Sequence, residues 1–181
     1  MIKKVLDWLY YFFELFANYS MFVTKMFIKF HMSSVKKEIQ MAGLTKQDKI
    51  LHIGCGAIPY TLIILSDVLK TKVVGIDNNQ KVVNNAKNVL KKFGKHDSII
   101  IDRADGVEYD ISSFNVVIVS YGINHHDLVL KHVIDSARKN SKVIIRGSNL
   151  EKNEYISRLI KKHYKNKIRV LLTQDSILLI V

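Results

Sequence analysis

Cysteine and proline are nearly absent from this 181-residue sequence, which contains one of each. A single cysteine excludes an intramolecular disulfide and a cysteine-rich zinc site, and it is typical of a reducing compartment. Together with only eight glycines, the single proline leaves few places for long loops. We therefore expect one folded, cytoplasmic protein, since a chain of this length can bury a sizeable core.

A hydrophobic run long enough to cross a membrane is also missing near the N-terminus. The longest charge-free run there, Leu15 to Thr24, has ten residues, whereas a spanning helix needs about 20. Asp7 and Glu14 interrupt the apolar residues, and no small-residue cleavage site follows. The segment therefore resembles neither a transmembrane helix nor a secretion signal.

Arginine is scarce although the chain is strongly basic. The net charge is +12, from 28 basic and 16 acidic residues. Such a charge is compatible with nucleic acid or an anionic membrane as a partner. However, the basic residues are almost all lysine, and arginine is the usual reader of phosphates and guanine edges. A nucleic-acid partner is therefore possible but not favoured over a small-molecule acceptor.

Short runs rich in valine and isoleucine recur from residue 49 onward. Few polar residues interrupt them, which is typical of strands buried on both faces of a sheet. The runs are "KILHIG" (49–54), "KVVGID" (72–77), "SIIID" (98–102), "FNVVIVSY" (114–121) and "KVIIRG" (142–147). The chain then ends in two β-rich runs separated by Gln174 and Asp175. This gap is too short for a crossover helix, so the last two strands are expected to form an antiparallel hairpin.

Helical periodicity separates these runs. Apolar residues fall on one helical face in 79–93, 126–139 and 152–164, and Pro59 suits the first turn of a helix reaching about Lys70. Strands that alternate with helices indicate an α/β fold with an open, mostly parallel sheet and right-handed crossovers.

Glycines follow the predicted strands. They stand at positions 54, 56, 106, 122 and 147, each at or shortly after the end of a run. In a parallel sheet these positions share the carboxyl edge, where ligands bind at the point at which strand order reverses. We expect the ligand site there.

The turn after the first strand, "GCGAIPYT", indicates which ligand class is expected. No Gly-Lys-Ser/Thr follows, which excludes a Walker phosphate loop. A dinucleotide fold normally has a third glycine where Ile58 stands, which disfavours a pyrophosphate over the helix start. Asp77 ends the next strand, where a carboxylate can accept hydrogen bonds from both hydroxyls of an adenosine ribose. Alternatively, Asp77 caps the helix at 79–93.

Taken together, "ILHIGCG", "VVGID", "RADG", "FNVVIVSYG" and the terminal hairpin resemble a class I S-adenosylmethionine-dependent methyltransferase over residues 49–181. The resemblance implies a Rossmann-like domain at 48–181, preceded by apolar N-terminal helices at 1–47. It also implies S-adenosyl-L-methionine as the cofactor.

The resemblance further implies which residues bind that cofactor. They are Gly54, Cys55, Gly56, Ala57, Asp77, Asn78, Asp105, Gly106 and Ser120. The first four would approach the methionine part, and Asp77 would bind the ribose. Asn78 and Asp105 would lie beside the adenine, with the Gly106 backbone near the ring. Ser120 would face the acceptor. Asp105 could instead be a plain turn residue. His52 stands where the family usually has an acidic residue that helps to hold the methionine end.

Catalytic residues are not expected to be prominent, because the sulfonium makes methyl transfer easy and the protein mainly positions the acceptor. Tyr121 and His125 are the candidates, with His126 beside them, although each is also compatible with a purely structural role. Cys55 is expected to be a spacer, and no metal site is predicted.

The loop "GCGAIPYT" also resembles nicotianamine synthases, a branch of this fold that shares the proline and threonine at Pro59 and Thr61. The resemblance continues through "FNVVIVSYGIN" and Lys131 to "VIIRGSN", with Arg146 after the fifth predicted strand. Those enzymes transfer the aminocarboxypropyl group instead of the methyl group. Three alternatives therefore stay open: a small-molecule methyltransferase, an aminocarboxypropyl transferase, or a non-catalytic module that binds the cofactor.

The N-terminal segment has three possible roles. Helices before the first strand commonly cover the cofactor and substrate cleft in the fold that the sequence resembles. Alternatively, residues 1–32, with tryptophan, phenylalanine and flanking lysines, could make peripheral contact with an anionic membrane. A dimer contact is the third alternative, and the oligomeric state is not predicted.

Overall fold

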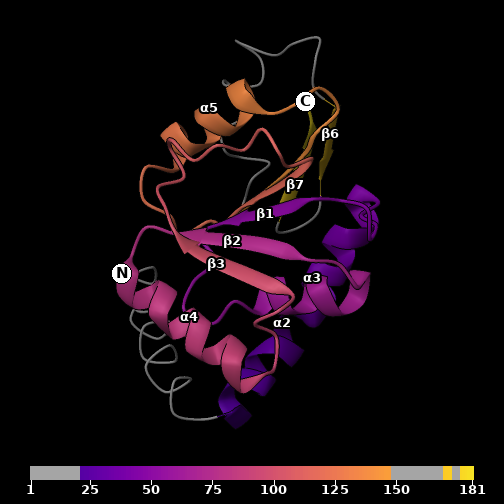
Figure 1. The fold of residues 1–181 in the computed structure, drawn as a ribbon. Coiled ribbons are helices and arrows are strands. Elements are labelled where there is room, and N and C mark those ends of the chain that lie inside the picture. The colour runs from indigo at the N-terminus through magenta and orange to yellow at the C-terminus, as the bar shows by residue number, and fades with distance from the viewer. Residues whose placement is uncertain (1–20, 148–168, 173–175) are drawn as a thin grey trace, which may run out of the picture.

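Strands and helices alternate along the chain as the hydrophobic pattern predicts. The computed structural model describes residues 21–147, 169–172 and 176–181. The strands are β1 (Ile50–Ile53), β2 (Val73–Asp77), β3 (Ile99–Arg103), β4 (Val116–Val119), β5 (Lys142–Arg146), β6 (Arg169–Leu172) and β7 (Ser176–Ile180). The helices are α2 (Met21–Ala42), α3 (Tyr60–Leu69), α4 (Gln80–Lys92) and α5 (His126–Ser136) (Figure 1).

The described strands form one sheet with the order β3-β2-β1-β4-β5-β7-β6. Neighbouring strands from β3 to β5 pair in parallel, whereas β7 is antiparallel to both β5 and β6. The antiparallel hairpin predicted from the C-terminal sequence is therefore confirmed. The strand order reverses between β1 and β4, so the ligand site of an open parallel sheet is expected beside the carboxyl ends of these two strands.

Helices cover both faces of the sheet. One apolar cluster joins α2, α3 and α4 to residues such as Ile50, Val73 and Ile144, and the other joins α5 to residues such as Leu51 and Val117. Figure 1 shows α5 on one side of the sheet and α3 and α4 on the other. Adjacent residues of β1 thus point into different clusters, which is why its short sequence has no polar alternation.

The edge strand β3 departs from the expectation of strands buried on both faces. Ile99 and Ile101 are buried, whereas the Ile100 side chain between them is 49% exposed. The strand lies at the end of the sheet order, where described helices cover only one of its faces. Burial on one face is ordinary for a strand at that position, and the valine and isoleucine content alone did not reveal it.

Helix boundaries agree with the sequence to within a few residues. Pro59 immediately precedes α3 with φ −79°, and the helix ends at Leu69. The periodic segment at 126–139 forms α5, which stops at Ser136. The helix predicted for 152–164 lies outside the described residues.

Helix α3 packs closely against β2 at Gly75, in the middle of that strand. The glycine therefore allows the close approach of helix and strand for which related loops use a third glycine. A Cβ atom at Gly75 would overlap Cδ1 of Leu62 and lie 3.0 Å from Cβ of Cys55. Leu62 is fully buried on α3. The close approach of helix and strand therefore depends on a glycine in the strand, while the buried Ile58 occupies the loop position.

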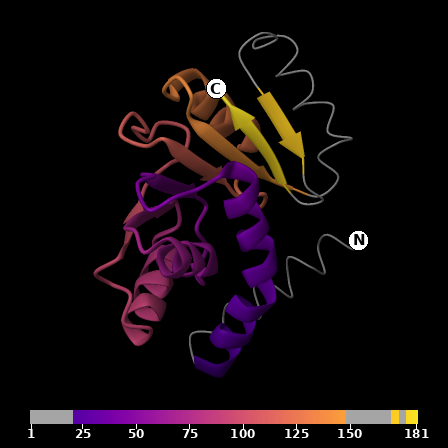
Figure 2. The same cartoon turned by 90° about the vertical axis from the view of Figure 1, so that its right-hand side faces the viewer.

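Helix α2 packs its inner side against the same core. Its buried residues include Ile28, Val35 and Ile39, and it contacts α3, β5 and β7. Figure 2 shows it as a long helix running past the sheet. Within the parts of the chain that the structure describes, no helix is both long enough and apolar enough to cross a membrane.

Candidate cofactor site

Two glycines shape the loop that follows β1. Gly54 and Gly56 have φ values of +76° and +71°, a region that strongly favours glycine. The backbone N–H groups of Gly54 and Cys55 both donate to the Ile76 carbonyl, at 2.9 and 3.0 Å. A Cβ atom at Gly54 would overlap the side chain of Ile123. The loop is therefore held against the end of β2 on one side and against the 120–124 loop on the other.

Asp77 lies directly beside this loop. One carboxylate oxygen accepts a hydrogen bond from the Gly56 N–H at 3.3 Å, and the other accepts one from the Asn79 N–H at 3.1 Å. Asp77 is not the N-cap of α4. That position is occupied by Asn79, whose side chain accepts a hydrogen bond from the Lys81 N–H at 2.9 Å. These two hydrogen bonds orient the Asp77 carboxylate. Asp77 is half-buried and lines the cavity described below.

Asp105 and Gly106 form the turn after β3. The Asp105 carboxylate accepts from the Val107 N–H at 2.9 Å, which is the geometry of an Asx turn. The turn role considered from sequence is thus present, and the side chain also lines the cavity. A Cβ atom at Gly106 would lie 2.6 Å from Cγ2 of Ile53. Glycine at this position lets the turn approach the end of β1.

These loops surround a cavity of about 640 Å³ at the carboxyl edge of the sheet. It is lined by every residue predicted to bind the cofactor except Ala57, which is buried beside it. Of the catalytic candidates, Tyr121 lines the cavity and is half exposed, whereas His125 is not among the lining residues. His125 precedes α5 in a left-handed conformation, with φ +52° and no side-chain capping hydrogen bond.

A second wall of the cavity comes from α2, the start of α3 and the end of β5. It contains Phe27, Tyr60 and Arg146. The His31 ring stacks on Tyr60 with centroids 4.2 Å apart, and the Arg146 guanidinium lies 6.0 Å from the Tyr60 ring centroid. Phe27 belongs to the N-terminal segment for which covering the cleft was one of three expected roles, whereas no ligand role was predicted for Tyr60 or Arg146.

Arg146 is fixed by an ion pair that sequence analysis missed. Its Nε and Nη2 atoms donate to both carboxylate oxygens of Glu38, at 2.9 and 2.6 Å, and Nη1 donates to Thr61 Oγ1 at 2.7 Å. Burial alone would lower the pKa of Arg146, but the charge and hydrogen bonds of Glu38 together raise it. One signal was available, because Glu38 is the sole acidic residue of α2.

His52 is the most unusual polar residue of the site. It is fully buried in β1, and its Nε2 shares a hydrogen bond of 2.8 Å with Ser120 Oγ. Its Nδ1 has no partner among the described residues. Burial, together with the positive charge of Arg146, holds the pKa of His52 well below its usual value. The imidazole is therefore neutral at physiological pH.

Cys55 is also buried, and burial together with Asp77 raises the pKa of its thiol well above the usual range. A thiol in that state is a poor nucleophile, which agrees with the spacer role expected for it.

Most of the chain matches the model of one protein family. The family model described as protein-L-isoaspartate(D-aspartate) O-methyltransferase (PCMT) matches residues 16–173. The chain belongs to this family. Membership confirms the resemblance to class I S-adenosylmethionine-dependent methyltransferases and the cofactor expected from it.

Relatives of this PCMT-family chain include a carboxy-S-adenosyl-L-methionine synthase from Nautilia profundicola, which is 21% identical over 122 residues. The match covers 65% of this chain and 51% of that protein, so the chain spans about half the length of the curated relative it matches.

Solved structures show the same fold at low identity. A mutant of MtNAS, a nicotianamine synthase, in complex with S-adenosylmethionine aligns with a TM-score of 0.73 and 16% identity, over 93% of this chain and 70% of that one. An RNA methyltransferase from Salinibacter ruber in complex with S-adenosyl-L-homocysteine aligns with a TM-score of 0.61 and 15% identity, over 81% and 88%.

Proposed function

We propose that the cavity binds S-adenosylmethionine and that the chain transfers the methyl group to a small-molecule acceptor. The observation behind this proposal is the contact of the Gly56 N–H with the Asp77 carboxylate at 3.3 Å. That contact places a glycine turn and an acidic side chain side by side at one end of the sheet, as a nucleoside-binding edge requires. Membership in a methyltransferase family supports the reaction class.

The residues present fit this cofactor. The cavity volume lies within the range of about 300–1,000 Å³ of small-molecule sites. Ile123 packs where a Cβ atom of Gly54 would lie, so glycine there lets the 120–124 loop close against the end of β1 and complete the cavity wall. Asp77 would accept from the ribose hydroxyls, and Asn78 with Asp105 would border the adenine. When bound, S-adenosylmethionine supplies an activated methyl group on sulfur.

The methionine end would be held differently from the usual arrangement of the resembled family. His52 occupies the position of the usual acidic residue and is neutral. Ser120 holds it through Nε2, and Arg146 is fixed nearby by Glu38. We infer that His52, Ser120 and Arg146, which all line the cavity, together orient this end of the cofactor.

The acceptor is expected beside the aromatic wall. Phe27 and Tyr60 line one side of the cavity, and Tyr121 lies at its exposed rim. Apolar and aromatic lining favours a small acceptor with an apolar or planar part. Tyr121 would orient the acceptor, whereas a role for His125 as a base has no support from the cavity lining.

The test is product analysis by mass spectrometry with S-adenosylmethionine and a panel of acceptors. The panel contains small phenols and amines, an isoaspartyl peptide (the acceptor named in the family description) and a short RNA. We expect S-adenosylhomocysteine to form with a small-molecule acceptor. Turnover of only the peptide or only the RNA would contradict the acceptor class, and turnover of none would favour a non-catalytic binding module.

An aminocarboxypropyl transferase is the second candidate. Two observations favour it: the loop contains Ile58 and Pro59 in place of the third glycine, and two nicotianamine synthase structures align over 93% of this chain. One of them contains MTA and tNA, according to its description. The same assay separates the two candidates, because aminocarboxypropyl transfer releases methylthioadenosine instead of S-adenosylhomocysteine.

A further inference from the structure

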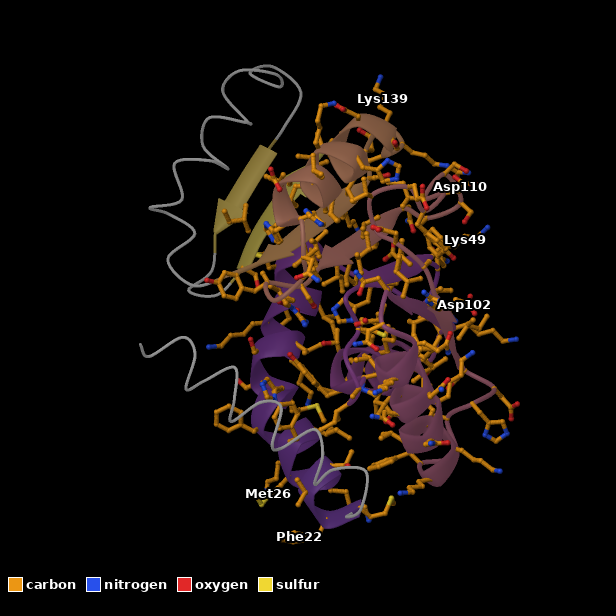
Figure 3. All side chains as sticks on the ribbon, turned by 90° about the vertical axis from the view of Figure 1, so that its left-hand side faces the viewer. Phe22, Met26, Lys49, Asp102, Asp110 and Lys139 are labelled. Atoms are coloured by element: carbon orange, nitrogen blue, oxygen red, sulfur yellow. The ribbon has the colours of Figure 1, made fainter. Side chains whose placement is uncertain are left out.

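Helix α2 presents large apolar side chains to solvent. Phe22, Met26 and Phe30 are 71%, 56% and 82% exposed. They are spaced four residues apart, so they lie along one side of the helix. Figure 3 shows Phe22 and Met26 at the N-terminal end of α2, directed away from the sheet. We call this side the outer face of α2.

The outer face is also strongly basic. Lys25, Lys29, Lys36 and Lys37 are exposed on the same half of the helix as Phe22, Met26 and Phe30. The only acidic residue of α2, Glu38, is 3% exposed and paired with Arg146. The outer face therefore combines aromatic and thioether side chains with lysines and contains no acidic side chain.

Packing within the part of the chain that the structure describes does not account for these side chains. The opposite side of α2 already buries Ile28, Val35 and Ile39 in the core, and it also contributes Phe27 to the cavity. A helix with one packed face ordinarily has a polar opposite face. Three adjacent exposed apolar residues on such a face indicate contact with another surface.

We propose that the outer face of α2 docks onto the surface of an anionic lipid bilayer. Phenylalanine and methionine side chains would enter the headgroup region while the lysines contact lipid phosphates. The net charge of +12 adds attraction at longer range. Docking would be peripheral, because α2 is not apolar enough to cross a membrane.

Charge favours the bilayer over a second copy of the chain. In a two-fold dimer each face meets its own counterpart, so Lys25 and Lys29 would meet lysines of the partner. An anionic bilayer instead neutralises all of them. Nucleic acid would engage the lysines but leave Phe22 and Phe30 without an apolar environment unless bases stack on them, which makes RNA a separate outcome to test.

The experiment is co-sedimentation of the full chain with vesicles of phosphatidylcholine alone or mixed with phosphatidylglycerol. We expect binding to the mixed vesicles that weakens with added salt. The variant Phe22→Ser/Met26→Ser/Phe30→Ser should lose most of it. Lys25→Glu/Lys29→Glu should weaken it by at least about tenfold, since each basic residue near such a surface contributes several-fold.

Matched controls separate the outer face from general charge and hydrophobicity. Lys49→Glu/Lys139→Glu makes the same charge change at exposed sites away from Phe22 and Met26 (Figure 3). Leu128→Ser removes an apolar side chain that is 48% exposed on α5. Both control variants should retain most of the binding, and thermal melts should confirm that all variants stay folded.

Three results would overturn the proposal. The first is no sedimentation with mixed vesicles at low salt. The second is full binding by the triple serine variant, which would assign the contact to another part of the chain. The third is that the triple substitution abolishes self-association or RNA binding of the wild-type chain while vesicle binding is unchanged.

Discussion

Gly54 illustrates how much of the site depends on a single residue. Its φ of +76° and the close packing of Ile123 leave no room for a side chain. Gly94 also has a positive φ, +61°, but a Cβ atom there would meet nothing within 4 Å. Replacing each glycine by alanine therefore separates the free-energy cost of a positive φ, present at both positions, from the cost of the overlap with Ile123, present only at Gly54.

We predict that Gly54→Ala lowers the free energy of unfolding more than Gly94→Ala does. Alanine at a positive φ costs about 1–2 kcal/mol, and Gly54→Ala adds the overlap with Ile123. Urea unfolding of both variants measures the difference. Equal losses of unfolding free energy would mean that the 120–124 loop moves aside easily and that its contact with Gly54 does not fix the cavity wall.

A second prediction concerns His52 and pH. Its pKa lies well below the usual 6.5, so the folded protein keeps the imidazole neutral while the unfolded chain binds a proton. The free energy of unfolding should therefore fall as pH decreases below about 6.5. His52→Gln should make this dependence shallower in urea unfolding at several pH values.

His96→Gln is the matched control for that experiment, because the His96 side chain is 64% exposed. This variant removes a histidine at an exposed site and so controls for the loss of a histidine as such. His31 and His126 also have lowered pKa values, mainly through burial, and should keep part of the dependence in the His52 variant. An identical slope in His52→Gln and in the wild type would contradict the account of His52.

At the scale of elements, the buried pair of Glu38 and Arg146 links α2 to β5. Glu38→Ala would leave the Arg146 charge buried without its partner, which typically costs about 3–5 kcal/mol. The exposed pair of Lys131 and Asp135 on α5 provides the comparison. Lys131→Ala should cost at most about 1 kcal/mol. Urea unfolding tests both, and a loss at Glu38 as small as that at Lys131 would show that water reaches the pair.

The sequence predicted elements better than it predicted contacts between them. Runs such as "VVIV" identify a strand because both faces are apolar, and the two-residue gap at Gln174 and Asp175 allows only a hairpin. Neither pattern reveals that β7 lies between β5 and β6, since pairing partners depend on tertiary packing. The pairing of Glu38 with Arg146, far apart in sequence, was hidden for the same reason.

At the scale of the molecule, the candidate site follows from the strand order. Reversal between β1 and β4 brings the loop after β1, Asp77, the 105–106 turn and Ser120 to one cavity. Sequence motifs anticipated these residues because each stands at or shortly after the end of a strand. They did not anticipate Tyr60, because that wall forms only when α2 and α3 pack across the same edge, whereas Phe27 lies in the N-terminal segment that was one candidate cover of the cleft.

The central claim, that this cavity binds S-adenosylmethionine, is tested most directly by isothermal titration calorimetry of the full chain. We expect one cofactor per chain, and Asp77→Ala should weaken binding by about ten- to a hundredfold, the loss of a charge-assisted hydrogen-bond pair. Asp77→Asn, which keeps one acceptor oxygen, should lose less. Asp102→Ala, an exposed carboxylate on β3 (Figure 3), should bind like the wild type. The absence of binding, or unchanged affinity in the folded Asp77→Ala variant, would contradict the account.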